Sequence, residues 1–597
     1  MKDDNAAAPN GAPFGLRIKM PHCHPCFGKI RFFALGLFLS CLLIPVPTAF
    51  AGEDSEATLC LLLKEQIESP LPDGRFVCRG NLICAAAFIS DFYAQRSYRP
   101  AWISGEKFLP AATQLVSVIT ATDEEGLRPE DYHLNQLKQL MEMVSDPPSG
   151  NTPPDLTVLR DLDLLLTDAF LLLGSHLLGG RVNPETLDPS WEAQSPGTDL
   201  AAVLKEALEK NTIPETLSYL APQRDGYKRL KKALAAFKKL SGTPCPPPIP
   251  PGPSLKLGDQ DYRVSMARDL LIFWGDRPAT PQSTTPALFG STLDTALRRF
   301  QARHGMTVDG VLGAKTLMAL NCPISDRISQ IVLNMERWRW MPHQLGTQYI
   351  LVNTADFSLR LVAGLETLME MRVVAGRPAQ LTPVLSSKID HLVINPYWHV
   401  PHSIAVRDIL PKLRKNPGYL REQHIKLFES WREKAPEIFP ESVDWNNISA
   451  HNFRYKLRQE PGVKNALGRI KFMFPNKFGV YLHDTPSRGL FKKTTRGFSS
   501  GCIRIEKPLD LAAYLLRDTP EWNYEAISAQ IESGETRVIP VNPAMPVHLL
   551  YLTAWMDENN TVQFRDDIYN RDDCLKSALA ETAPLPTAAK RKKGACP

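Results

Sequence analysis

The chain has 597 residues, more than one hydrophobic core accommodates, and this length predicts about three or four domains. Its 69 Lys and Arg nearly balance its 64 Asp and Glu, which excludes a polyanion-binding protein, so no nucleic-acid partner is expected. The basic run at 590–593 is typical of a solvated, disordered tail.

Residues 1–51 have the pattern of an export signal. Lys29 and Arg31 precede an apolar run at 32–46, and an Ala-x-Ala cleavage site ends at Ala51. The run has about 15 residues, fewer than the roughly 20 that a comfortable transmembrane helix needs. We therefore expect a signal peptide, or alternatively an uncleaved membrane anchor, and export of the rest of the chain in both cases.

Residues 52–243 show helical periodicity and are predicted to form a helical scaffold domain. The Leu-rich stretch at 159–180 contains three Asp residues, so it is too polar to cross a membrane and is expected to be a buried core helix. The segment 244–255 is rich in proline, which prevents a helix and favours an extended linker. A compact helical unit follows at 256–322, and residues 323–347 are expected to be a connector.

From residue 348 the pattern changes to β-branched and aromatic runs broken by turn residues, which predicts a sheet domain over 348–540. A helical pattern interrupts it at 403–469. That interruption exceeds ordinary connector lengths, so it is predicted to be a lid or a small subdomain. Residues 541–597 are expected to be a C-terminal extension that ends in the basic tail.

Cys502 has two competing interpretations. Eleven cysteines are present and three lie in or before the apolar run, which leaves eight in the exported part. An even number in an oxidising compartment favours complete pairing, so Cys502 could be half of a disulfide. An unpaired thiol near the chain end, such as that of Cys596, has no structural cost, so the even count does not exclude a free Cys502.

The alternative is that Cys502 is a nucleophile served by His483. A free thiol is mostly protonated at neutral pH, and a nearby imidazole raises the reactive thiolate fraction. The imidazole of His483 would then return the proton to a departing amine. No metal or other cofactor is required for this chemistry.

Four neighbours complete the predicted site. Gly501 and Ser500 are expected to border an oxyanion, because a glycine lets backbone N–H groups approach it. Tyr481 lies two residues before the histidine and therefore falls on the same strand face, where it can line the pocket. Arg504 would hold a substrate carboxylate or brace the loop.

Two stretches around this pair, FGVYLHDTP at 478–486 and GFSSGCIRI at 497–505, resemble the signature of YkuD-type L,D-transpeptidases. Ser500 replaces the histidine that the family commonly has before glycine, and the Asn often found after Arg504 is absent. The stretch FQARHGMTVDGVLGAKTLMALN at 300–321 is similar to a common peptidoglycan-binding domain. The resemblance implies a multidomain α+β protein with a helical scaffold, a small helical peptidoglycan-binding domain and a mainly β catalytic domain that carries a helical lid insertion.

The resemblance also implies a function in cell-wall biogenesis and cell shape. Cys502 would attack a tetrapeptide stem, and a stem amine would take the acyl group to form a 3→3 cross-link. The expected location is the periplasm, and the expected partners are stem peptides and glycan strands, with other cell-wall synthases and carboxypeptidases beside them. Carbapenems are expected to acylate the cysteine.

Three alternative functions belong to different classes of protein. With water as the acceptor the same site is an L,D-carboxypeptidase. A non-catalytic peptidoglycan-binding scaffold would not need the intact His483 and Cys502 pair. A papain-like protease would place its cysteine before its histidine, which is the reverse of the order found here.

Overall fold

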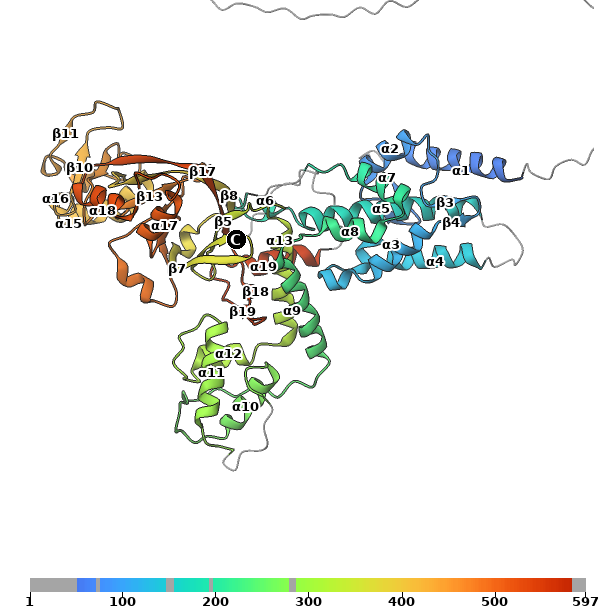
Figure 1. The fold of residues 1–597 in the computed structure, drawn as a ribbon, viewed down its shortest axis with the longest axis horizontal. Helices are drawn as coiled ribbons and strands as arrows, with labels where there is room; N and C mark the ends of the chain where they lie inside the picture. Colours follow the sequence, from blue (N-terminus) through green and yellow to red (C-terminus); the bar gives the residue numbers. More distant parts are fainter. Residues whose placement is uncertain (1–50, 71–75, 147–154, 193–196, 279–285, 582–597) are drawn as a thin grey trace, which may run out of the picture. The chain divides into compact units, whose positions relative to one another are not determined.

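The computed structural model describes residues 51–70, 76–146, 155–192, 197–278 and 286–581 (Figure 1). The predicted export signal, except its last residue, and the predicted basic tail lie outside the described residues. No helix in these described ranges is both long and apolar enough to cross a membrane. The chain from Gly52 onward forms one compact unit.

The predicted scaffold region is helical, and its longest helix is buried on nearly all sides. Helix α5 lies among α2, α3, α4, α7 and α8 (Figure 1). The Asp residues of α5 are tolerated because the protein supplies their partners: Asp163 accepts hydrogen bonds from the backbone N–H groups of Ala101 and Trp102, the latter at 2.7 Å. The helices of this region are α1 (Ala51–Glu68), α2 (Ala86–Gln95), α3 (Pro110–Thr120), α4 (Leu134–Ser145), α5 (Leu156–Gly179), α6 (Pro184–Leu187), α7 (Leu200–Lys210), α8 (Ile213–Leu220) and α9 (Asp225–Ser241).

The next unit is small and helical, as predicted, with α10 (Arg263–Phe273), α11 (Ser291–Arg303) and α12 (Ala314–Leu320) around its own core. The proline-rich segment before it has no helix, but it is not a free spacer. The side-chain amide of Asn321 pairs with both backbone groups of Ile249, at 2.8 Å each, and Ile249 is buried. The segment is therefore packed onto this unit.

The segment 323–347 was expected to be a connector, and most of it is instead a packed helix, α13 (Ile324–Arg339). Ile331, Met335 and Trp338 share a hydrophobic core with the scaffold helices. The buried guanidinium of Arg337 lies 2.5 Å from the carboxylate of Asp572 in α19 (Arg571–Ala580). Charged residues hide the burial of this helix from a hydrophobicity pattern. Their charges are matched inside the protein, by a distant partner for Arg337 and within the helix for Arg339 and Glu336.

A twisted sheet forms the core of the next region. Its strand order is β15-β7-β16-β14-β13-β8-β17-β5-β6, and β6 also pairs with β7, so the sheet closes into a barrel. Helices α17 (Pro508–Leu515) and α18 (Tyr524–Ser533) pack onto its core. The strands are β5 (Gln348–Asn353), β6 (Ser358–Ala363), β7 (Glu366–Gly376), β8 (Leu385–Ile394), β13 (Ile470–Met473), β14 (Leu482–His483), β15 (Gly497–Ser499), β16 (Ile503–Ile505) and β17 (Arg537–Leu550).

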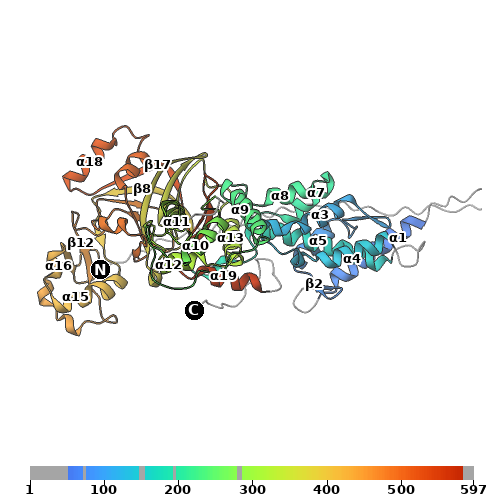
Figure 2. The same cartoon turned by 90° about the horizontal axis from the view of Figure 1, so that it is seen from below.

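The predicted domain end at residue 540 is wrong. Strand β17 continues to Leu550 and lies between β8 and β5 in the sheet (Figures 1 and 2). Its prolines hide the strand from a sequence pattern, and one of them, Pro543, lies where the pairing register shifts between Pro540 and Met545. The hairpin of β18 (Ala554–Met556) and β19 (Val562–Phe564) then follows.

The insertion at 403–469 is not purely helical, which corrects the prediction. It forms a subdomain with its own hydrophobic core and a sheet in the order β11-β10-β12-β9. Figure 2 shows β12 of this sheet near α15 and α16. The strands are too short for alternation to reveal them. The elements are β9 (Trp398–His399), α14 (His402–Ile404), the π-helical η4 (Ala405–Ile409), α15 (Leu410–Lys415), α16 (Tyr419–Glu422), β10 (Ile425–Phe428), β11 (Glu437–Ile438) and β12 (Lys456–Gln459).

Candidate active site

The strand register brings the predicted site residues onto one face of the sheet. Strands β14 and β16 are parallel, with His483 opposite Arg504. Tyr481 and Cys502 each lie two residues earlier, so they share that face because strand side chains alternate. Strand β13 runs antiparallel to β14 and places Lys471 opposite His483. The alternate residues of these strands lie in the barrel core.

Cys502 is a free thiol, whereas Cys574 is in a disulfide. Burial raises the pKa of the Cys502 thiol. Hydrogen bonds from the backbone and hydroxyl of Tyr481, and then the charges of Lys471 and Arg504, act in the opposite direction and do not offset the burial. The resting thiol is therefore protonated at neutral pH.

His483 is neutral at rest as well. Its side chain is buried, and burial followed by the charges of Arg504 and Lys471 lowers its pKa to about 3. The ring Nδ1 lies 2.6 Å from the carbonyl oxygen of Asp484. A carbonyl only accepts, so Nδ1 carries the proton and the lone pair lies on Nε2.

The site therefore combines a neutral thiol with a neutral imidazole. The sequence predicts that His483 raises the thiolate fraction of Cys502. In the resting site this proton transfer is unfavourable, because burial destabilises both the thiolate and the imidazolium that it would produce. The positively charged groups that act on both pKa values are the half-buried side chains of Lys471 and Arg504.

Lys471 was missed by sequence reasoning. Its Nζ lies 3.9 Å from the centre of the Tyr481 ring. Burial lowers the pKa of Lys471, and the nearby Cys502 acts in the opposite direction. Nothing in the sequence distinguishes this lysine from a surface lysine, since only the antiparallel register with His483 brings it into the site.

A buried hydrogen-bond network shapes the turn before the nucleophile. Gly501 has φ of +114°, a conformation that side chains rarely adopt. Its N–H donates to Ser499 Oγ at 3.2 Å, and Thr382 Oγ1 donates to its carbonyl at 2.9 Å. Ser499 Oγ also donates to the carbonyl of Cys502. The backbone conformation thus explains why glycine occupies position 501. Its N–H group is already hydrogen-bonded in the structure. No sequence signal identified Ser499 or Thr382 as members of this network.

Ser500 and Arg504 lie in different surroundings. Ser500 is exposed, and Nη2 of Arg407 from the insertion donates to its Oγ at 3.0 Å. Arg504 Nε is buried and has no hydrogen-bond partner among the described residues. Because the Nε atoms of other buried arginines are unpartnered in the same way, this does not distinguish the carboxylate-binding role of Arg504 from the bracing role, and both stay predictions. No group of three or more His, Cys, Asp or Glu in the described ranges is placed to hold a metal ion.

Three regions of the chain match models of known protein families. Residues 347–531 match the model described as "L,D-transpeptidase catalytic domain" (YkuD). The chain contains a YkuD-type L,D-transpeptidase catalytic domain. Residues 260–320 match the "Putative peptidoglycan binding domain", and residues 87–234 match the "Scaffold domain". The predicted resemblance and α+β fold class are confirmed.

Individual relatives extend this picture. The chain is 34% identical over 248 residues to a Haemophilus influenzae protein named "Putative L,D-transpeptidase", covering 42% of this chain. The match spans about half of that relative, 49% of its length.

Two solved structures are also similar. An L,D-transpeptidase from Xylanimonas cellulosilytica has 13% identity and a TM-score of 0.16, over 50% of this chain and 100% of that one. One from Stackebrandtia nassauensis has 12% identity and a TM-score of 0.19, over 52% and 97%. TM-scores this low do not establish a shared fold, so the domain assignment rests on the family model.

The Cys502 thiol should react slowly with electrophiles at neutral pH. Because the pKa of Cys502 is raised, alkylation of Cys502 by iodoacetamide at pH 7 should be slower than that of the exposed Cys245 and should accelerate as pH rises above 9. Tyr481→Phe removes a hydroxyl that lowers this pKa, so it should move the rise to higher pH. Peptide mass spectrometry measures both rates.

The matched control is Tyr514→Phe, because the Tyr514 hydroxyl bonds to Gln348. It should leave the alkylation profile unchanged. Alkylation of Cys502 that is faster than that of Cys245 at pH 7 would show a resting thiolate and contradict this description of the site.

Proposed function

We propose that this protein is an L,D-transpeptidase that forms 3→3 cross-links in peptidoglycan through an acyl-enzyme on Cys502. The observation that carries the proposal is the free thiol of Cys502 on the same sheet face as His483, within a YkuD-type domain. The upstream match to a peptidoglycan-binding domain supports the same substrate.

The first half-reaction makes the acyl-enzyme. The sulfur of Cys502 forms a bond to the carbonyl carbon of the third residue of a tetrapeptide stem. The thiol proton passes to Nε2 of His483 and then to the amine of the terminal D-residue, which leaves as its C–N bond breaks. The products are a thioester and a free D-amino acid.

The second half-reaction transfers the acyl group. A side-chain amine of a neighbouring stem attacks the thioester carbon and loses a proton to His483. The C–S bond then breaks, and the proton returns to the sulfur of Cys502. Lys471 and Arg504 lie close enough to the sulfur to shift its pKa, so they also stabilise the negative charge of each tetrahedral intermediate.

The substrate also determines the proposed location and partners. Peptidoglycan lies outside the cytoplasmic membrane, so the protein would act in the periplasm, exported by residues 1–51 as a signal or held by them as an anchor. Carboxypeptidases that produce tetrapeptide donors and synthases that build the strands would act on the same material.

Muropeptide analysis tests the proposed function. Purified sacculi incubated with the protein should gain dimers joined 3→3, identified by liquid chromatography and mass spectrometry. Tripeptide products without dimers would instead identify an L,D-carboxypeptidase. The absence of both products would favour the non-catalytic scaffold.

The insertion subdomain would act as a lid over the site. We call its contact with the catalytic turn the latch, formed by Arg377, Arg407, Asp408 and Ser500. Asp408 lies 3.4 Å from Arg377 Nη2 and 2.6 Å from Arg407 Nη2. Since Ser500 is two residues before Cys502, the latch holds the insertion against the turn that carries the nucleophile. A closed lid excludes water, which favours transfer over hydrolysis.

Weakening the latch should change the fate of the acyl-enzyme. Arg407 keeps the pKa of Asp408 below its ordinary value, so the carboxylate is charged at neutral pH. Such half-exposed ion pairs contribute about 0–1 kcal/mol of stabilising free energy. If the closed lid loses that much stability in Asp408→Ala, the ratio of tripeptide to dimer should rise by up to about fivefold. Product analysis of muropeptides measures this ratio.

The control is the double variant Arg421→Ala and Glu441→Ala, which removes an exposed ion pair within the insertion. It should leave the ratio unchanged. If Asp408→Ala is folded and its ratio matches the wild type, the latch does not govern access of water.

A further inference from the structure

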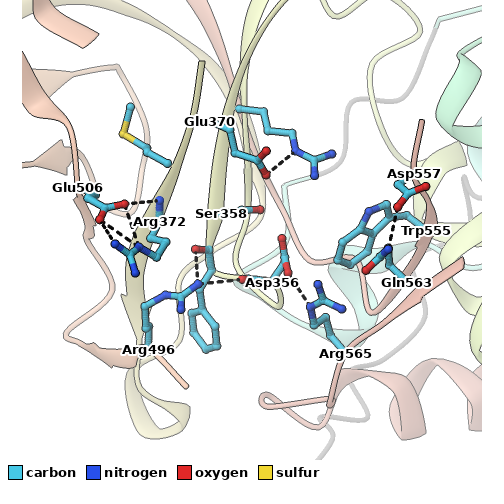
Figure 3. A pocket seen from close by; sticks show the side chains of 13 residues that line it. Asp356, Ser358, Glu370, Arg372, Arg496, Glu506, Trp555, Asp557, Gln563 and Arg565 are labelled. Carbon is cyan, nitrogen blue, oxygen red and sulfur yellow. Dashed lines mark hydrogen bonds and ion pairs between the residues drawn. The ribbon is translucent and has the colours of Figure 1, made fainter. Parts of the chain in front are cut away.

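A second polar cavity lies on the barrel apart from Cys502. Its volume is about 430 Å³, within the range of ligand sites, and it lies between strands β6 and β7 and the hairpin of β18 and β19. Figure 3 shows Trp555 and Gln563 on one side and Arg372 and Glu506 on the other. Neither Cys502 nor His483 is among the described residues that line it.

The cavity continues into a second one of about 300 Å³. The two share five lining residues, Asp356, Ser358, Arg360, Trp555 and Asp557. Because they share these residues, the two cavities adjoin and form one groove. We call it the Trp555 groove, after the aromatic residue among these five.

Charges in the groove are paired, so it offers hydrogen bonds without a net charge. Arg565 Nε lies 2.6 Å from Asp356, and Arg360 Nε lies 3.1 Å from Glu370. The first cavity is lined by four Arg and four acidic residues, which balance each other: Arg360, Arg372, Arg496, Arg565, Asp356, Glu370, Glu506 and Asp557. This balance disfavours a polyanion and suits a ligand with many neutral donors and acceptors.

Trp555 supplies the apolar surface that such a ligand needs. Its side chain is half-buried, and the guanidinium of Arg565 lies 4.7 Å from its ring centre. The cation therefore fixes the indole beside the paired charges. A pyranose ring combines an apolar C–H face with hydroxyl groups around its edge, which matches an indole bordered by ion pairs.

We propose that the Trp555 groove binds sugar rings of a glycan strand. The choice of the peptidoglycan glycan rests on the proposed function. The groove also adjoins the peptidoglycan-binding domain: Arg565 Nη1 donates to the carbonyl of Arg303 at 3.0 Å, and the hydroxyl groups of Thr307 and Thr494 lie 3.0 Å apart. The groove and that domain are therefore neighbours, so both can contact one glycan strand.

Hydrogen–deuterium exchange with the full chain tests this proposal. The probe is the β-1,4-linked tetramer of N-acetylglucosamine, which carries no peptide. It should slow exchange in peptides covering 354–372 and 553–566, separately from any effect in 256–322. Trp555→Ala should weaken the protection of the groove peptides, with an affinity lower by about tenfold.

Two further variants serve as a control and as a second test of the groove. Trp431→Ala removes an exposed indole in the insertion and should leave the protection unchanged. If Trp555→Ala does not fold, Glu370→Ala removes one partner of a half-exposed ion pair and should weaken the same protection.

Three results would overturn the proposal: protection restricted to 256–322, equal protection in Trp555→Ala, or protection of the groove by a free tetrapeptide stem and not by the sugar. The proposed function fails on a different result, cross-linking by a protein without Cys502, so the two failures are distinguishable.

Discussion

Cys502→Ala is expected to abolish the formation of 3→3 dimers, with a loss of about a thousandfold or more. The loss is large because the thioester cannot form without the sulfur, and no other cysteine replaces it in the register opposite Tyr481. Dimer formation from tetrapeptide muropeptides, followed by mass spectrometry, measures the rate. Cys322→Ala removes a half-buried thiol of another region and should keep the wild-type rate.

A covalent probe checks the same residue independently of the acceptor. Incubation with a carbapenem should add one adduct to the intact wild-type protein, on the peptide that contains Cys502. The Cys502→Ala variant should gain no mass. Equal mass gain in both proteins, or none in either, would contradict the nucleophile assignment.

His483→Ala is expected to lower kcat/KM by about 10²–10⁴-fold, the usual contribution of a general base. The effect should be nearly as severe as loss of the thiol, because members of one proton-transfer pair are not additive. The pH profile distinguishes a base from a structural residue. Since the pKa of His483 is about 3, the imidazole stays neutral, and wild-type kcat/KM should not fall between pH 8 and 5 through titration of this residue.

The control for this variant is His391→Ala, which removes a half-exposed histidine of β8 that contacts Asp390. It should leave turnover unchanged. Near-normal turnover of a folded His483→Ala would require another base, and an acidic limb near pH 6 in the wild type would show that the imidazole is charged more easily than its buried position allows.

The domain organisation could largely be predicted from the sequence, and its failures share a cause. The helical and sheet regions and the compact unit at 256–322 follow from periodicity and turn residues, whereas the peptidoglycan-binding identity of that unit came from its resemblance to a known domain. Strand β17 and helix α13 were misjudged because their prolines and charges contradict the pattern of a buried element. In β17 the pairing register shifts beside the prolines, and in α13 a distant residue, Asp572, pairs with Arg337.

Part of the candidate site could likewise be predicted from the sequence, and part could not. The nucleophile and base candidates can be recognised in the sequence, because the motif around His483 and Cys502 is local and specific; their catalytic roles stay predictions. The neutral resting form of both groups depends on the three-dimensional fold, since the whole barrel buries them. The strand register, which pairs residues far apart in the chain, likewise added Lys471 to the site and set Arg407 of the insertion against Ser500.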